Sequence, residues 1–170
     1  MIYLSIGSNL SSSFGDRIYN IKKTVHLLRN NEIFIKKISS FYETPSYPNE
    51  KNPRFINIAL SIFFKGKPND LLSKIIHIEN IMGRIRKIKN EPRICDIDII
   101  DFKKQIIKVD KLEIPHPLAS NRNFVLFPLK EICADWRHPI SNENIDILIG
   151  NLTNTLRNEI TRIDESAILL

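Results

Sequence analysis

The chain has 170 residues, of which 42% are hydrophobic, and its formal net charge is +6. This length and composition fit one globular domain over residues 1–170. No apolar run reaches the roughly 18 residues that a membrane-spanning helix needs, and no basic segment precedes an apolar one at the start. Neither membrane insertion nor secretion is therefore expected. The basic charge suits an anionic ligand but does not by itself indicate nucleic acid.

The two cysteines, Cys95 and Cys133, have no C-x-x-C partner and no histidine spacing that suits zinc. Two reduced thiols are expected, which predicts a cytoplasmic location. We expect a monomer that binds small molecules and neither membranes nor nucleic acid.

Hydrophobic periodicity predicts the chain order strand, helix, strand, strand, helix, strand. The predicted strands cover residues 2–6, 33–44, 55–64 and 97–102, and the predicted helices cover residues 18–30 and 68–82. This order is typical of a ferredoxin-like α+β sandwich, which is an antiparallel βαββαβ sheet with helices on one face. A turn is predicted at residues 7–9 and a short extra hairpin over residues 106–114. Two later helices are predicted over residues 123–132, with a break or kink at Pro128, and over residues 144–152.

Two carboxylates, Asp96 and Asp98, open the last predicted strand. Side chains alternate along a strand, so both point to one face, with Cα atoms roughly 6.6 Å apart. With an effective dielectric constant near 20, their repulsion is about 2.5 kcal/mol, which a divalent cation would convert into attraction. Five potential phosphate partners flank the pair: Arg84, Arg86, Arg93, His116 and Arg122. The mixture indicates chemistry on a metal-bound polyphosphate, although an exposed acidic pair can also be merely solvated.

Several short motifs lie along most of the chain: Ile6-Gly7-Ser8-Asn9-Leu10, Phe41-Tyr42-Glu43-Thr44-Pro45, Phe55-Ile56-Asn57, Gly83-Arg84-Ile85-Arg86, Arg93-Ile94-Cys95-Asp96-Ile97-Asp98, Pro115-His116-Pro117, Asn121-Arg122-Asn123-Phe124-Val125-Leu126 and Pro128-Leu129. In this order and spacing they resemble the motifs of the 6-hydroxymethyl-7,8-dihydropterin pyrophosphokinase family. The family has a ferredoxin-like fold. It transfers pyrophosphate from ATP to a pterin alcohol in folate biosynthesis and releases AMP. The resemblance implies the same fold, activity and substrates for this chain.

The resemblance also implies roles for individual residues. Asp96 and Asp98 match ligands of two Mg²⁺ ions that bridge the triphosphate, and together with Arg84 and Arg93 they form the expected catalytic set. The expected ATP contacts are Glu79, Arg86, Arg93, Ile99, Lys111, His116 and Arg122. The arginines at 84, 86 and 93 match a loop that closes over ATP, where they would offset charge on the transferred group. The alternative is an exposed helix carboxylate for Glu79 and solvated side chains for Arg84, Arg86 and Lys111.

The second substrate requires a flat slot. By resemblance, Phe55 and Phe124 stack on the two faces of the pterin. Asn57 lies on the same strand face as Phe55 and can offer a donor and an acceptor to the pterin edge. Thr44, Pro45 and Tyr47 are expected to complete that edge. Core packing is the alternative for Phe55, whereas Asn57 favours the slot because a buried amide needs partners.

The chain departs from the family pattern in three places. A tryptophan and a glycine are missing between Arg86 and Arg93, the loop over residues 46–54 lacks a glycine and an Asp-Gln pair, and Asn123 replaces a small residue. We expect an active but slower enzyme. Two alternatives remain open: an inactive relative that acts as a binding protein, and a basic RNA-binding domain, although the paired aromatic residues of such a domain are missing.

Overall fold

The computed structural model describes residues 1–47, 49–84 and 91–163. Its centre is a six-stranded sheet with the order β5-β1-β4-β3-β8, in which β2 also pairs with β4. The strands of this sheet are β1 (Ile2–Ser8), β2 (Phe34–Ile38), β3 (Phe41–Thr44), β4 (Phe55–Phe63), β5 (Asp96–Phe102) and β8 (Thr161–Ile163). All of their pairings are antiparallel. When β2 and β3 are counted as one interrupted strand, β1 to β5 with α1 (Arg17–Asn30) and α2 (Pro68–Ile81) follow the ferredoxin-like βαββαβ order, so the predicted fold class is confirmed.

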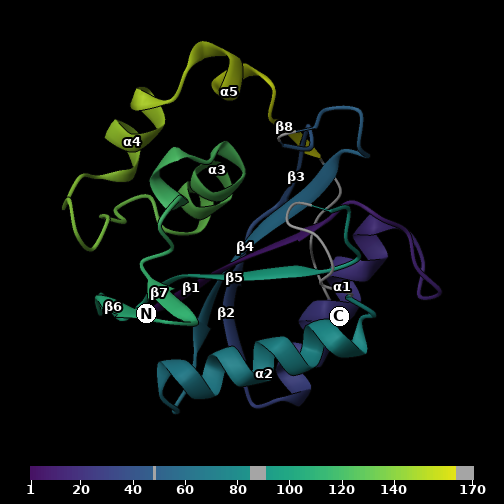
Figure 1. The fold of residues 1–170 in the computed structure, drawn as a ribbon. Helices are drawn as coiled ribbons and strands as arrows, with labels where there is room; N and C mark the ends of the chain where they lie inside the picture. The colour runs from purple at the N-terminus through teal and green to yellow at the C-terminus, as the bar shows by residue number, and fades with distance from the viewer. Residues whose placement is uncertain (48, 85–90, 164–170) are drawn as a thin grey trace.

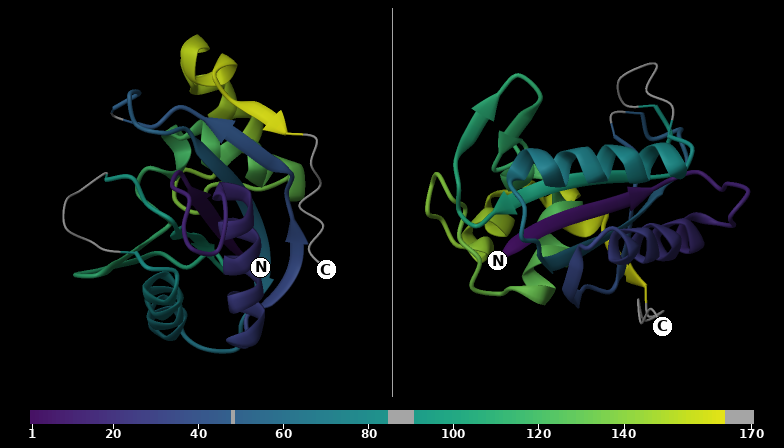
Figure 2. Two further views of the ribbon diagram at one scale, coloured as in Figure 1. Left: turned by 90° about the vertical axis from the view of Figure 1, so that its right-hand side faces the viewer. Right: turned by 90° about the horizontal axis from the view of Figure 1, so that it is seen from below.

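Helices α1 (Arg17–Asn30) and α2 (Pro68–Ile81) cover one face of the sheet. Figure 2 shows these two helices side by side. They pack on alternate residues of the central strands, because side chains of a strand alternate between faces. The strand residues of this core are Ile2, Leu4 and Ile6 of β1 and Ile56, Ile58, Leu60 and Ile62 of β4.

The opposite face is also covered, which corrects the expectation of helices on one face. Helix α3 (Asn123–Ile132) lies there, with α4 (Ile145–Asn151) beside it (Figure 1). Tyr3, Ala59 and Ile100 of the sheet pack with these helices in a second buried cluster. The central strands are therefore buried on both faces, and β1 is buried along its whole length.

The bounds of two predicted elements differ in the structure. The strand predicted over residues 33–44 is divided at Ser39 and Ser40 into β2 and β3. The Ser39 hydroxyl oxygen accepts a hydrogen bond from the backbone N–H of Ala59 at 2.9 Å, where a strand carbonyl would otherwise accept it. Of the predicted break or kink at Pro128, a break is absent, because α3 continues through this residue. The buried residues of α3 that pack on the sheet hold it helical on both sides of the proline.

The remaining elements are short. β6 (Ile107–Val109) and β7 (Leu112–Ile114) form the predicted hairpin, and η1 (Ala119–Asn121) precedes α3. The helix predicted over residues 144–152 is α4, whose N-cap side chain, Asn144, accepts from the N–H of Ile147 at 2.9 Å. The sequence did not indicate α5 (Asn154–Asn158) or β8. No helix in the part of the chain that the structure describes has the length and apolar character that a bilayer crossing requires.

Candidate active site

The two aspartates of β5 lie on the same face of the sheet, as strand alternation predicted. Ile97 and Ile99 of the same strand are buried in the core beside α1 and α2, so the carboxylates face the α3 side. Both aspartates are only partly buried. They are therefore accessible from outside the sheet, and Ile99 could contact a ligand on their face only through its backbone.

One row of the sheet connects the acidic pair with Asn57. Gly7 of β1 pairs with Asp96 on one side and with Asn57 on the other. Because neighbouring strands are about 4.8 Å apart, Asn57 lies roughly 10 Å from Asp96. A Cβ atom on Gly7 would lie 3.0 Å from Asn57 Oδ1 and 3.3 Å from the Phe55 ring. The glycine thus leaves space between the two parts of the site, and the predicted turn begins later than expected because β1 continues through Ser8.

Two guanidinium groups neutralise Asp96. Arg84 Nη1 lies 2.6 Å from Asp96 Oδ1, and the Nε and Nη2 atoms of Arg93 lie 2.6 and 2.5 Å from Asp96 Oδ2. All three side chains are largely shielded from water, which strengthens these charge-assisted bonds. The predicted cluster of Arg84, Arg93 and Asp96 therefore forms. Arg86, which was predicted with it, lies outside the described residues.

Glu79 is a buried member of the same cluster. Its side chain is 1% exposed, so the alternative of a solvated helix carboxylate is wrong. Glu79 Oε1 accepts a hydrogen bond from the backbone N–H of Ile97 at 2.9 Å and also binds the guanidinium of Arg84. This hydrogen bond holds the β5 backbone in place at Ile97, between the two aspartates. Glu79 thus links α2 to the acidic pair and orients one of its arginines.

Asp98 has a different environment. Its Oδ2 atom lies 3.6 Å from Arg122 Nη1 and 3.8 Å from His116 Nε2, which are longer separations than those around Asp96. Burial, followed by repulsion from Asp96, raises the pKa of Asp98 to about 7. The cationic neighbours reduce this shift without cancelling it. A cation beside Asp98 would therefore be strongly stabilised at neutral pH.

The neighbouring imidazole of His116 is neutral at physiological pH. Burial and the charge of Arg122 lower its pKa to about 4. Its Nδ1 atom accepts a hydrogen bond from the backbone N–H of Leu118 at 3.1 Å. In a neutral ring this bond places the proton on Nε2, which lies 3.8 Å from Asp98 Oδ2 and 3.4 Å from Arg122 Nη1. In this tautomer His116 presents an N–H to Asp98, and its contact with the Arg122 guanidinium is not a hydrogen bond.

Asn9 is a positioning residue that was predicted to lie in a turn and in a family-like motif, without a role of its own. It is 1% exposed. Its Oδ1 atom accepts from the N–H of Arg93 at 2.6 Å, its own N–H donates to the Arg93 carbonyl at 3.0 Å, and its Nδ2 donates to the Pro53 carbonyl at 3.1 Å. Asn9 therefore joins the segment that carries Arg93 to the loop that leads to Phe55. An asparagine directly after a buried strand was the available signal.

The predicted slot residues lie on the face that carries the acidic pair. Asn57 is 3% exposed, and its Nδ2 atom donates to Thr44 Oγ1 at 3.0 Å. The rings of Phe55 and Phe124 are partly buried, and each lies beneath a guanidinium: Arg93 is 5.1 Å from the first ring and Arg122 is 5.3 Å from the second. The same two arginines therefore contact the acidic pair and the aromatic residues.

Other predicted residues lie outside this cluster. The side chain of Tyr47 is 83% exposed, whereas Pro45 is partly buried. Lys111 is exposed in the turn of the β6–β7 hairpin. The structure gives none of these three a side-chain contact with the acidic pair, and their assigned roles stay predictions.

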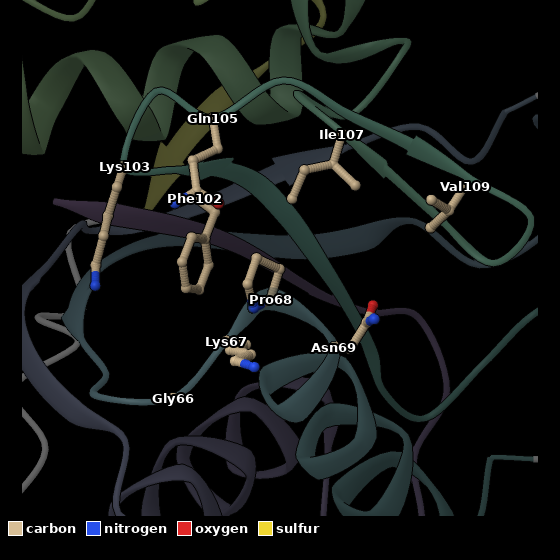
Figure 3. A pocket seen from close by; sticks show the side chains of 9 residues that line it. All are labelled: Gly66, Lys67, Pro68, Asn69, Phe102, Lys103, Gln105, Ile107 and Val109. Atoms are coloured by element: carbon tan, nitrogen blue, oxygen red, sulfur yellow. The ribbon is translucent and has the colours of Figure 1, made fainter.

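A surface pocket elsewhere is separate from this cluster. It lies at the far end of β5, between the start of α2 and the β6–β7 hairpin (Figure 3). Figure 3 shows Phe102 of β5 beside Pro68 of α2. Phe102 is six residues from Asp96, which is roughly 20 Å along a strand. The pocket has neither the acidic pair nor the arginines in its lining.

The site combines carboxylates that can hold a cation, cationic donors around them and an open surface toward a polar slot. This combination suits the transfer of a phosphoryl or pyrophosphoryl group from a nucleotide polyphosphate. The fold and the site thus define a phosphotransferase of the ferredoxin-like class.

Comparisons with known proteins agree with this class. Residues 3–134 match the model of the family described as 7,8-dihydro-6-hydroxymethylpterin-pyrophosphokinase (HPPK). A Bacillus subtilis relative, 2-amino-4-hydroxy-6-hydroxymethyldihydropteridine pyrophosphokinase, is 38% identical over 145 residues, which cover 85% of this chain and 84% of the relative. The Dictyostelium discoideum folic acid synthesis protein FOL1 is 42% identical over 91% of this chain, but this chain spans only 23% of it.

A solved structure shares the fold. The Plasmodium falciparum HPPK-DHPS crystal structure with pteroate superposes with a TM-score of 0.69 at 16% identity, covering 95% of this chain and 47% of that one. The chain thus spans about half of that structure. The chain belongs to the HPPK family, and it is a pyrophosphokinase.

Proposed function

We propose that this chain transfers the pyrophosphoryl group of ATP to the hydroxymethyl oxygen of 6-hydroxymethyl-7,8-dihydropterin in folate biosynthesis. The observation that carries the proposal is the row Asp96, Gly7 and Asn57, which joins a cation-binding pair to a buried amide roughly 10 Å away. This separation suits a pterin whose alcohol must reach a phosphate held at the acidic pair. Membership of the HPPK family supports the same substrates.

The acidic pair fits Mg²⁺ by its chemistry. Mg²⁺ prefers oxygen ligands and usually keeps several waters and phosphate oxygens, so it needs only one or two protein carboxylates. Asp96 and Asp98 supply these, and no cluster of three or more potential metal ligands occurs among residues 1–47, 49–84 and 91–163. We propose two ions at this pair, as the resemblance implies. Bound Mg²⁺ would neutralise the polyphosphate and polarise the bonds that change.

Arg84 and Arg93 can serve two kinds of partner. In this structure they neutralise Asp96 at 2.5–2.6 Å. A cation held by the acidic pair would take over this role and leave their planar donor groups to phosphate oxygens, which they bind well in pairs. Arg122 and the Nε2–H of His116 approach from the Asp98 side. The charge of the transferred group would thus be surrounded by donors on both sides.

In the proposed reaction, the substrate hydroxyl oxygen attacks the β-phosphorus in line. A new oxygen–phosphorus bond forms while the bond between the β-phosphorus and the oxygen bridging to the α-phosphorus breaks, and AMP leaves. The hydroxyl proton is released. Asn57 and Thr44 hold the pterin edge, and Phe55 and Phe124 hold its faces, so the alcohol is positioned for attack. Positioning and electrostatics supply the acceleration, because this reaction needs no nucleophilic side chain.

We further propose that residues 1–170 act as one monomeric domain in the cytoplasm. Both faces of one sheet carry the hydrophobic clusters, which supports a single folding unit. The two thiols, Cys95 and Cys133, are free, which suits a reducing compartment. We prefer an active enzyme over the binding-protein alternative because the acidic pair and its arginines are all present.

The test is the production of AMP. The protein is incubated with Mg²⁺, ATP and the hydroxymethyl pterin, and AMP is followed by chromatography. We expect AMP in proportion to the pterin consumed, and none without pterin. Asp98→Ala should abolish it, whereas Asp110→Ala, in the exposed β6–β7 turn, should leave it unchanged. If the unmodified protein makes no more AMP than Asp98→Ala, the proposal is wrong.

A further inference from the structure

The C-terminal segment, residues 153–163, contacts both walls of the substrate slot. Its strand β8 pairs with β3, which carries Thr44 (Figure 1). The pairing sets Tyr42 opposite Arg162 and Glu43 opposite Thr161. This segment follows the residues matched by the family model, which end at 134. Its contacts with the slot are therefore a feature of this chain that the family match does not address.

Asn123 is the first point of contact. This side chain is 2% exposed and stands between Arg122 and Phe124 at the start of α3. Its Nδ2 atom donates to the Leu156 carbonyl at 2.6 Å and to Glu159 Oε1 at 3.1 Å. Its Oδ1 atom accepts from the backbone N–H of Phe124 at 2.7 Å. All hydrogen-bonding atoms of this buried amide are thus used to tie the start of α3 to the C-terminal segment.

Glu159 also reaches the other wall. Its backbone carbonyl accepts from Arg54 Nη2 at 3.3 Å. The Arg54 Nε atom is bonded in turn to Glu43 Oε2 of β3 at 3.1 Å. Arg54 directly precedes Phe55, just as Asn123 directly precedes Phe124. One residue therefore touches both positions that come immediately before the two aromatic rings of the slot.

From this arrangement we propose that Asn123 and Glu159 are positioning residues that set the distance and tilt between Phe55 and Phe124, and so determine pterin affinity. The inference rests on the proposed function, because it takes the two rings as the pterin slot. Stacking depends strongly on ring separation and angle. A link between the backbone positions beside the rings controls both, without touching the pterin itself.

The sharpest test compares KM values for the two substrates. Asn123→Ala removes both donors to the C-terminal segment. Glu159→Ala removes the side-chain acceptor of Asn123 and keeps the backbone carbonyl that accepts from Arg54. We expect each variant to raise the pterin KM about five- to thirtyfold, which corresponds to losing one or two buried hydrogen bonds. The ATP KM should change less than about twofold. Glu159→Gln keeps an acceptor oxygen and should restore values near those of the unmodified protein.

A matched control is Asn154→Ala in the same segment. Asn154 is exposed and bonds only to Arg157 in the described contacts, so its loss should leave both KM values unchanged. A purely structural role would lower the melting temperature without moving the ratio of the two KM values. Pterin titration by calorimetry gives the same comparison without turnover.

The outcomes separate the two proposals. If the unmodified protein is inactive and binds no pterin, the proposed function fails and this inference fails with it. The Glu159 side chain is partly exposed, so Glu159→Ala is expected to fold. If the unmodified protein is active and Glu159→Ala changes the pterin KM by less than about twofold, only the positioning role is refuted. An equal rise in both KM values would also overturn it.

Discussion

Replacing Asp98 by asparagine should stabilise the protein while destroying its activity. The amide keeps the shape of the carboxyl group but cannot ionise. Burial and the charge of Asp96 raise the pKa of Asp98 to about 7, so the ionised form is unfavourable in the metal-free fold. Asp98→Asn removes this penalty. It also removes a carboxylate that would hold the cation, so catalysis should fall by about a hundredfold or more.

The size of the stability gain follows from the same shift. A change from the ordinary value of 3.8 to about 7 would correspond to about 4 kcal/mol if it were fully expressed. The side chain of Asp98 is 29% exposed, however, so solvent screening reduces the effect. We expect Asp98→Asn to raise the free energy of unfolding by about 1–2 kcal/mol at pH 8, or the melting temperature by roughly 2–8 °C.

The pH dependence makes this prediction specific. A group whose pKa is raised by folding favours the folded state fully below its unfolded pKa, and this benefit is lost as the pH rises through the folded value. The gap between Asp98→Asn and the unmodified protein should therefore be widest above pH 7 and narrow toward pH 4. Thermal unfolding in a chelating buffer at several pH values measures it, with Asp110→Asn as a control. A gap that is absent at pH 8, or equally large at pH 4, would refute the electrostatic account.

Three further predictions concern other parts of the site. Because burial lowers the pKa of His116 to about 4, its ring signals in NMR spectra should not titrate between pH 5.5 and 8, and the pH profile of the reaction rate should show no step from this group. A ring titration near pH 6.5 would contradict the buried neutral ring. Glu79→Gln keeps an acceptor for the backbone N–H of Ile97 but removes the negative charge that faces Arg84, so it should lower the free energy of unfolding, measured by urea titration, by about 2 kcal/mol. A change below about 0.5 kcal/mol would contradict a stabilising ion pair between Glu79 and Arg84. Phe55→Leu should raise the pterin KM about tenfold with little effect on ATP, whereas Phe34→Leu, on an exposed part of β2, should change neither; equal effects would argue against a stacking wall.

Local pattern was enough for the parts of the fold that depend on periodicity. The alternation of β4 placed Ile56 to Ile62 on one face, and the spacing of Asp96 and Asp98 placed both on the other side of β5. These features follow from the twofold repeat of a strand, which needs no knowledge of distant residues. The basic residues that flank the acidic pair in the sequence were predicted as phosphate partners, and the described ones do gather at the pair.

Contacts between distant segments could not be read in the same way. An apolar strand face shows that something covers it, but not which segment, so the position of α3 on the second face was missed. The division at Ser39 depends on a side-chain bond to Ala59, twenty residues away. Glu79 looks like an ordinary helix carboxylate in the sequence, and only its contact with Ile97 and Arg84 makes it part of the site.

The distribution of charge suggests why the site is stable both with and without a nucleotide. Asp96 is already balanced by Arg84 and Arg93, whereas the contacts of Asp98 with the described residues are longer and its pKa is raised. Cation binding would therefore cost Asp96 little electrostatic stabilisation, because the arginines that it releases can bind phosphate. Asp98 would be stabilised most, since the cation would offset the cost of ionising this carboxyl group. Mg²⁺ binding should accordingly release a proton from Asp98 and weaken about tenfold for each pH unit below 7, which calorimetry in buffers of different ionisation enthalpy can measure. Proton release that is absent at pH 6 would show that Asp98 is not the group that responds to the cation.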